Sequence, residues 1–204
     1  MEKILIIGAG GHAKSVIDVV ESTKKYKIIG LIDNNTKINN KKIFKYEILG
    51  SNKDLKIMRK TCKFAIVGIG QIKSAQKRIN NFELLKKLRF QIPKIFSTTS
   101  YISKNTIVGD GTVIFHGVYV NAGASIGDNC IINTRSIIEH DVKIGNHCHV
   151  STGATLNGGV ILGDNSFVGS GAVIKENVKI GKNCIVAAKS FLKKDLEDNK
   201  IYNP

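Results

Sequence analysis

The chain has 204 residues, of which 42% are hydrophobic and 23% are charged, so it is long enough for one or two globular domains with a sizeable core. No apolar run approaches the roughly 20 residues of a transmembrane helix, which argues against insertion into a membrane. The opening segment from Met1 to Gly8 is too short for a signal peptide and has no small-residue cleavage site. We therefore expect a cytoplasmic protein whose four cysteines are reduced thiols.

The chain is strongly basic, with 31 Lys and Arg against 16 Asp and Glu, for a formal charge of +15. Residues 1–95 hold 21 basic and 7 acidic side chains, whereas residues 96–204 hold 10 and 9. Such a field would attract a polyanion, a nucleotide diphosphate or an anionic surface, and a solvated lysine-rich face explains the same counts. Charge alone favours nucleic acid, but no zinc finger and no basic helix interleaved with aromatic residues is present. We therefore expect no nucleic-acid partner.

Residues 1–95 predict a small α/β domain. Apolar runs at 3–7, 28–32 and 64–67 are typical of buried strands, and helical patterns follow the first run and cover about 74–88. Strands that alternate with helices indicate a parallel sheet with right-handed crossovers. The domain is half the size of a full dinucleotide-binding fold, a half-Rossmann-like unit, which argues against a complete NAD site.

Glycine-rich or polar turns follow the predicted strands. The first, Gly8-x-Gly10-x-x-Ala13, is a degenerate dinucleotide fingerprint, in which glycines allow a tight turn and helix amides face a phosphate. Asp33 lies 20 residues beyond Ala13, where it could accept a ribose hydroxyl, and the third turn contains Gly70. These turns share the sheet edge at which open α/β folds bind ligands. At this point the turns are compatible with binding of a nucleotide sugar, with binding of NAD, or with a purely structural role.

Residues 96–204 follow a period of six. Every sixth residue from Phe96 to Leu192 is apolar, and chance would produce this with a probability on the order of 10⁻⁷. The period predicts a parallel β-helix with three short strands per coil and 18 residues per coil. Cys130, Cys148 and Cys184 share a second inward phase, so we expect them to be buried and inert rather than catalytic.

The hexads resemble those of the left-handed β-helix acyltransferases, and the left hand is taken from this resemblance. The whole chain is similar to the NeuD/PglD-type sugar acetyltransferases, which include sialic acid O-acetyltransferases and amino-sugar N-acetyltransferases. The likeness rests on the Lys3–Ile7 strand, the loop from Gly8 to Lys14, Asp33-Asn34, Ile69-Gly70, Asn133-Thr134, Ile138-Glu139-His140-Asp141, Ile144-Gly145 and His149-Val150-Ser151. It implies an acetyl-CoA-dependent homotrimer with active sites between subunits and a nucleotide sugar held by the N-terminal domain.

The same resemblance implies a role for individual residues. His140 matches the general base and Asp141 its acidic neighbour, whereas His149, Ser170 and Ala188 match positions that contact acetyl-CoA. The nucleotide-sugar contacts match Gly10, Gly11, His12, Asp33, Asn34 and Gly70. The chain departs from its relatives at Tyr202-Asn203-Pro204, where they usually continue beyond a Gly-x-Pro-Ala turn.

Acetyl transfer needs a proton acceptor for the attacking amine or hydroxyl, and an imidazole titrates near neutral pH. His140 lies two residues after an inward Ile138 and hence near a corner of the coil. Successive strand residues face opposite sides, so Asp141 reaches His140 only if the backbone bends between them. His149 precedes an inward Val150, so we expect it to face outward, toward a partner subunit.

The favoured function is N-acetylation of a UDP-linked 4-amino-4,6-dideoxy sugar for bacterial surface glycans by direct transfer. O-acetylation of sialic acid is the alternative enzyme, since an amine and a hydroxyl use the same base. A trimeric nucleotide-binding scaffold is the non-catalytic alternative. A carbonic anhydrase of the γ type would need a His-x₄-His pair for zinc, which the sequence lacks, so we expect no metal.

Overall fold

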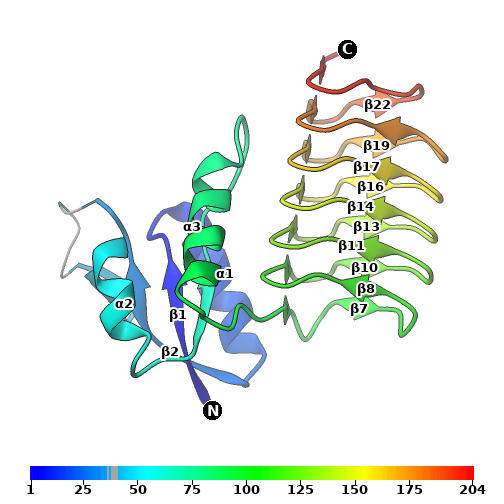
Figure 1. The fold of residues 1–204 in the computed structure, drawn as a ribbon. Coiled ribbons are helices and arrows are strands. Elements are labelled where there is room, and N and C mark those ends of the chain that lie inside the picture. The colour runs from blue at the N-terminus through cyan, green and yellow to red at the C-terminus, as the bar shows by residue number, and fades with distance from the viewer. Residues whose placement is uncertain (36, 38–40) are drawn as a thin grey trace.

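The computed structural model describes residues 1–35, 37 and 41–204, and it consists of two parts that lie side by side (Figure 1). The N-terminal part is an α/β unit, and the C-terminal part is a tall prism of stacked coils. The N-terminus lies at the lower end of the α/β unit, whereas the C-terminus lies at the top of the prism (Figure 1). Among the described residues, no helix combines the length and the apolar character that crossing a bilayer requires.

The α/β unit is built on a five-stranded sheet in the order β3-β4-β2-β1-β5. Its elements are β1 (Glu2–Ile7), α1 (Gly11–Ser22), β2 (Tyr26–Ile32), β3 (Lys42–Ile43), β4 (Tyr46–Gly50), a 3₁₀ turn (Asn52–Asp54), α2 (Leu55–Met58), β5 (Phe64–Val67) and α3 (Gln76–Lys87). All neighbours are parallel except β3 and β4. The three predicted strands and two predicted helices are confirmed. The edge strand β3 and its neighbour β4 were not predicted, because they mix lysine and glutamate with isoleucine and show no long apolar run.

The prism has three faces, and each face is a parallel sheet. Its strands are β6 (Ile95–Phe96), β7 (Tyr101–Ile102), β8 (Ile107–Val108), β9 (Val113–Ile114), β10 (Tyr119–Val120), β11 (Ser125–Ile126), β12 (Ile131–Ile132), β13 (Ile137–Ile138), β14 (Lys143–Ile144), β15 (His149–Val150), β16 (Thr155–Leu156), β17 (Ile161–Leu162), β18 (Phe167–Val168), β19 (Val173–Ile174), β20 (Lys179–Ile180), β21 (Ile185–Val186), β22 (Phe191–Leu192) and β23 (Ile201–Tyr202). We call the sheets the β6 face (β6, β9, β12, β15, β18, β21, β23), the β7 face (β7, β10, β13, β16, β19, β22) and the β8 face (β8, β11, β14, β17, β20).

The coils confirm the predicted left-handed β-helix and its 18-residue repeat. Val120 pairs with Ile138, and Ile138 pairs with Leu156 in the next coil. The inward residues of the hexads are buried from Val108 to Leu192, and so are the three cysteines of the prism. Burial raises the pKa of the Cys148 thiol well above its usual range, because the dry interior disfavours a thiolate. The chain turns each corner with help from residues in the left-handed region, such as Asn129 and Asp141 at φ 51° and 61°.

The α/β unit is fastened to the β6 face and to the corner between the β8 and β6 faces. Arg78 on α3 donates to the carbonyls of Asn129 and His147, and Gln71 Nε2 donates to the carbonyl of Asn165 at 2.9 Å. These three carbonyls occupy the same position in three consecutive coils, where the left-handed backbone turns them outward. Burial lowers the pKa of Arg78 to about 10, so its guanidinium still carries a charge at neutral pH.

Candidate active site

His140 and Asp141 form an exposed pair at the corner between the β7 and β8 faces. His140 Nδ1 lies 2.9 Å from Asp141 Oδ2, and the two side chains are 63% and 71% exposed. The bend that this pairing requires is present, because Asp141 has a φ of 61°. A carboxylate at Nδ1 favours the tautomer that carries its proton there, which leaves Nε2 free to accept a proton. The corner therefore presents a base to a ligand that approaches from outside the chain.

The neighbouring coils leave room for this pair. A Cβ atom added at Gly158, one coil above, would lie 2.6 Å from both Cε1 and Nε2 of His140. One coil below, a Cβ at Gly123 would lie 2.5 Å from Asp141 Oδ1. The Asn121 amide donates to Glu139 Oε2 at 2.8 Å, which holds the strand end that precedes His140. The imidazole thus lies against glycine rather than against a side chain.

The turns after β1, β2 and β5 enclose a pocket of about 840 Å³ at the carboxyl edge of the sheet. The predicted substrate residues all line it: Gly10, Gly11, His12, Asp33, Asn34 and Gly70. Asp33 braces the glycine loop, because its carboxylate accepts hydrogen bonds from the amides of Ala9 and Asn35, both at 2.8 Å. The helix α1 begins at Gly11, so its first amides lie at the pocket and form a place for phosphate.

One wall of this pocket was not predicted from the sequence. Asn52, Asn80, Asn81 and Lys77 line it from the 3₁₀ turn and from α3. Asn52 Nδ2 donates to Asn81 Oδ1 at 2.9 Å, and the Asn52 amide donates to Asn34 Oδ1 at 3.0 Å. Polar residues on a helix face usually indicate solvent exposure, so the sequence offered only the Asn80-Asn81 doublet as a signal. These amides and the ammonium offer donors and acceptors for the polar groups of a ligand.

His149 and His12 lie where the α/β unit covers the β6 face. His149 does face outward from the prism, but it is buried against the chain's own Gln71 rather than presented as a free surface. Its Nδ1 donates to the Gln71 carbonyl at 2.8 Å, and its ring packs edge-on against Phe167. The His12 ring lies 6.3 Å from that of His149. Burial lowers the pKa of His12 to about 4 and that of His149 to about 3, so both are neutral at physiological pH.

The lowered pKa values of His12 and His149 lead us to expect that the stability of the fold depends on pH. In the unfolded chain a histidine has a pKa of about 6.5. Below that pH the unfolded state therefore binds protons at these two histidines, whereas the folded state does not. Their contribution to the free energy of unfolding is therefore complete above about pH 6.5 and declines as the pH falls toward 4. We expect the thermal midpoint to fall over this range and to fall less steeply in His149→Phe. Parallel slopes for the two proteins in melts followed by circular dichroism would contradict this assignment.

Ser170 and Ala188 lie at the corner between the β6 and β7 faces. Both are exposed, and they occupy the same position in consecutive coils. Ser170 Oγ lies 2.9 Å from Ser151 Oγ. A Cβ at Gly169 would meet the Ala188 amide nitrogen, so the coils approach each other closely there. The corner offers a narrow backbone-lined surface to a neighbouring molecule.

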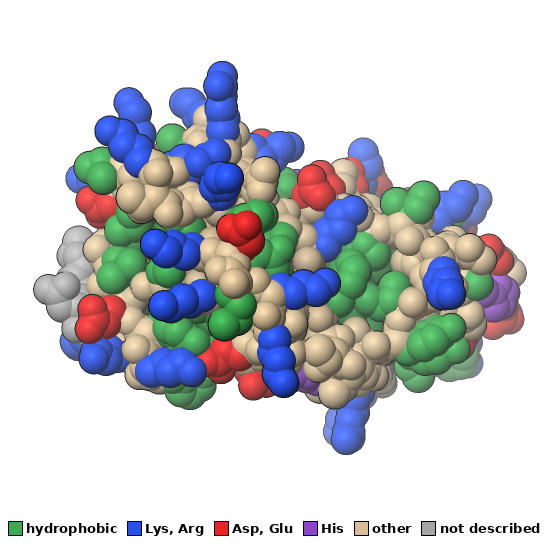
Figure 2. All heavy atoms as spheres, turned by 90° about the horizontal axis from the view of Figure 1, so that it is seen from below, with side chains coloured by type: hydrophobic (Ala, Val, Ile, Leu, Met, Phe, Trp, Pro, Cys, Tyr) green, Lys and Arg blue, Asp and Glu red, His purple; other side chains and the backbone are tan. Residues whose placement is uncertain are grey.

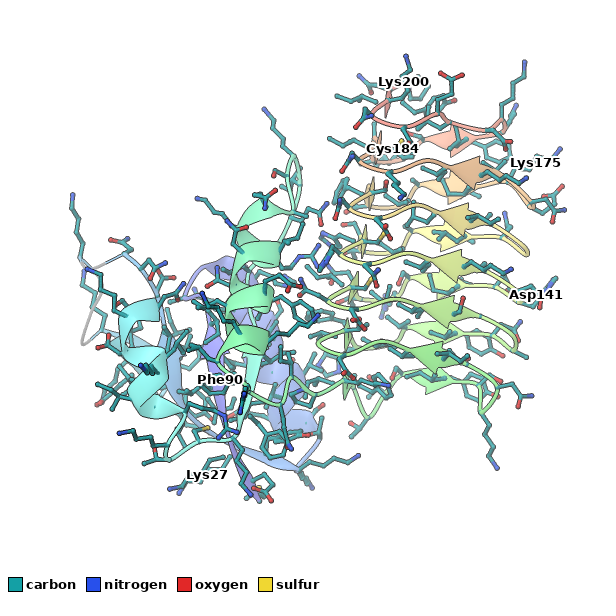
Figure 3. The ribbon with its side chains drawn as sticks, in the orientation of Figure 1. Lys27, Phe90, Asp141, Lys175, Cys184 and Lys200 are labelled. Atoms are coloured by element: carbon teal, nitrogen blue, oxygen red, sulfur yellow. The ribbon has the colours of Figure 1, made fainter. Side chains whose placement is uncertain are left out.

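The predicted site residues therefore fall into separate groups within one chain. The glycine-loop pocket, His12 and His149 lie together, because the α/β unit covers the β6 face. His140 and Asp141 lie on the opposite corner of the prism, where Asp141 points away from the α/β unit (Figure 3). One chain thus does not bring its His140–Asp141 pair to its own pocket. Within residues 1–35, 37 and 41–204, no three His, Cys, Asp or Glu side chains gather as metal ligands would.

Two family models match the chain. A family model described as the PglD N-terminal domain matches residues 3–82, and the bacterial transferase hexapeptide model matches residues 123–158 and 159–194. A search of curated proteins by sequence finds no match.

Several solved structures are similar over the whole chain. The acetyltransferase domain of PglB from Neisseria gonorrhoeae, solved with acetyl coenzyme A, is 25% identical at a TM-score of 0.91, covering 98% of this chain and 95% of that one. PerB from Caulobacter crescentus, solved with CoA and GDP-perosamine, is 27% identical at a TM-score of 0.91, covering 98% and 93%. WeeI from Acinetobacter baumannii shares the fold at 24% identity and a TM-score of 0.86, covering 100% and 97%. The chain belongs to the NeuD/PglD-type family of sugar acetyltransferases.

Proposed function

We propose that this protein transfers an acetyl group from acetyl-CoA to the amino group of a nucleotide-linked 4-amino-4,6-dideoxy sugar, with UDP as the favoured nucleotide. The observation that carries the proposal is the exposed His140–Asp141 pair on a prism whose α/β unit holds a pocket with a phosphate-binding loop. The likeness to PerB, which was solved with CoA and an amino-sugar nucleotide, supports the same pair of substrates. Assembly of surface glycans is the process that such a product serves.

The nucleotide sugar binds in the glycine-loop pocket. The amides at Gly10 and Gly11 receive the diphosphate at the start of α1, where the helix dipole favours an anion. Asp33 and Asn34 lie at the end of β2 and take the ribose, whereas Gly70 lies on the opposite side of the pocket entrance. Acetyl-CoA lies along the corner with Ser170 and Ala188, and His149 marks the end near the thioester.

The chemistry is direct transfer within a ternary complex. As the amine nitrogen attacks the thioester carbonyl, Nε2 of His140 accepts its proton, and Asp141 stabilises the resulting imidazolium through Nδ1. The tetrahedral intermediate collapses, the C–S bond breaks, and the proton passes from the imidazolium to the CoA thiolate. No acyl-enzyme is needed, and the three prism cysteines are buried away from any substrate.

A complete site requires a second copy of the chain. His140 and the chain's own pocket lie on opposite sides of the prism, so the pocket of one subunit must receive His140 from another. A ring of three chains with their prisms side by side satisfies this need, because a heterologous contact closes when the rotation returns to the first subunit. Exposed apolar residues on the β7 face, including Tyr101, Tyr119, Ile137 and Phe191, suit such a contact.

Mixed trimers test this arrangement. Gly10→Phe is expected to fill the pocket without strain, since the glycine has open space around its Cβ position, and His140→Ala removes the base. Neither variant alone should turn over. Subunits mixed in equal amounts and reassembled should regain about one quarter of wild-type activity, because a site is intact only where complementary subunits meet. No recovery would show that each site lies within one chain.

The acceptor is tested by measuring thiol release from acetyl-CoA. The panel comprises UDP- and GDP-linked 4-amino-4,6-dideoxy sugars, CMP-sialic acid and free sialic acid. Turnover with a UDP-linked amine supports the proposal, and turnover only with the GDP-linked sugar corrects the nucleotide. Turnover only with sialic acid would replace it with O-acetylation by the same base. A folded protein that binds a nucleotide but not acetyl-CoA would instead be a scaffold.

A further inference from the structure

The lower end of the α/β unit is a strongly basic surface. The parallel strands β1, β2 and β5 all begin there, and the helices α1, α2 and α3 all end there. We define the basal face as the cations at these strand starts and helix ends: Lys3, Lys24, Lys25, Lys27, Arg59, Lys60, Lys63, Lys87, Arg89 and Lys94. Figure 2 shows this end of the molecule, with Lys and Arg outnumbering Asp and Glu over the α/β unit.

Pairing within the fold brings these cations together. Lys3 is the direct partner of Lys27 in the sheet, the Glu2 amide donates to the Lys25 carbonyl, and the Gln91 amide donates to the Lys63 carbonyl. The basal-face side chains are exposed apart from Arg59, which is half-buried. In the part of the chain that the structure describes, Lys94 alone among them has a carboxylate partner within 4.0 Å, namely Asp110. The charges are therefore largely uncompensated.

A crevice of about 480 Å³ opens beside this face, where the α/β unit joins the prism. Lys25 and Lys94 line it together with Tyr26, Thr98 and the apolar Phe96, and Asp110 also lies on its wall. Two ammonium groups and the hydroxyls of Thr23, Tyr26 and Thr98 beside an apolar wall suit the phosphate and glycerol of a lipid headgroup.

We propose that the basal face binds the surface of a bilayer rich in anionic phospholipids. The glycine-loop pocket lies at the carboxyl ends of the strands and the basal face at their amino ends, so a bound membrane leaves the pocket open. The helices α1, α2 and α3 end at the basal face, so none of them projects from it along a nucleic-acid groove, and Phe90 at the end of α3 is buried. In the trimer of the proposed function, on which this step rests, three basal faces point the same way and match a plane. The three basal faces of a trimer would bind the same anionic bilayer at once, so the trimer would bind it more tightly than a single chain does.

The test is co-sedimentation of the full-length protein with vesicles. The vesicles contain phosphatidylcholine alone or with roughly 30% phosphatidylglycerol, in about 100 mM salt. We expect binding only to the anionic vesicles and release in high salt. Charge reversal at Lys25→Glu, Lys27→Glu and Lys63→Glu should weaken binding by at least about tenfold.

The matched control reverses three cations at the opposite end of the molecule: Lys182→Glu, Lys194→Glu and Lys200→Glu. Figure 3 places Lys27 and Lys200 at the two ends. This control changes the net charge equally and should still bind. Equal loss in both variants, absence of vesicle binding, or tighter binding to an oligonucleotide than to vesicles at the same salt would each overturn the proposal. Acetyl transfer in solution is measured separately and should survive in the basal variant, so failure of the enzyme proposal and failure of the membrane proposal are distinguishable.

Discussion

Replacing His140 by asparagine is expected to lower kcat for the amino-sugar acceptor by about 10²- to 10⁴-fold, the range typical of a lost general base. Asparagine keeps a polar group at the corner but cannot accept a proton. The side chain is largely exposed and contributes little buried area to the fold, so the variant should assemble and bind acetyl-CoA as wild type does. Steady-state kinetics with a coenzyme-binding titration measures both quantities.

The matched control for this substitution is Lys104→Ala. Lys104 occupies the same corner position two coils below His140, and it is exposed. It should leave kcat within about twofold of wild type, as expected for an exposed side chain away from the chemistry. Asp141→Asn should give a smaller loss than His140→Asn, because it weakens the orientation and stabilisation of the imidazolium but keeps the base. If kcat of His140→Asn stayed within a few-fold of wild type, His140 would not be the base.

Adding a single methyl group beside the His140 imidazole, in Gly158→Ala, is expected to lower kcat by about 10- to 100-fold, because small displacements of reacting groups are costly. The backbone does not demand glycine here, since Gly158 lies outside the left-handed region. Other coils carry Lys104, Ala122 and Glu176 at this corner position. The glycine is instead required by the His140 ring, because the new Cβ would lie 2.6 Å from Nε2.

A double-mutant cycle separates this explanation from general damage to the fold. In the His140→Ala background the ring is gone, so Gly158→Ala should add less than about a twofold change. Glu176→Ala, one coil above, serves as the control for altering this corner and should leave kcat near wild type. Independent, multiplicative losses from Gly158→Ala and His140→Ala would mean that the glycine acts through something other than the imidazole.

The prism was predictable almost residue by residue, since its order is periodic. The side chain at every sixth position from Phe96 to Leu192 must be apolar and each corner must turn, so the hexad period carries the coiled architecture, whereas its left hand came from the family resemblance. The α/β unit was predictable only at its centre, where strands such as Ile4–Ile7 are buried on both faces. The strands β3 and β4 are short, half exposed and partly polar, and such segments carry no pattern that separates them from loops.

The candidate site shows the same contrast. The His140–Asp141 pairing depends on the left-handed backbone conformation of Asp141. Aspartate tolerates this conformation, but the spacing of residues in the sequence does not predict it. The burial of His149 depended on how the α/β unit sits on the prism, as did the role of Arg78, which appears in the sequence as one more cation among many. Contacts between separately folded parts leave no periodic signal, so these residues become recognisable only when both surfaces are in place.

The stacking of identical coils also means that this protein can change length only in discrete steps. Arg78 and Gln71 together hold carbonyls in three consecutive coils, so a coil added or removed among them would break the attachment of the α/β unit. A duplication above Asn165 would leave that attachment intact and would raise the upper part of the prism by one strand spacing, about 4.8 Å. Insertion of a single hexad would instead rotate everything above it onto the next face, carrying Ser170 and Ala188 away from their corner. Natural length variation that preserves activity should therefore come in multiples of 18 residues, and it should be found toward the carboxyl end.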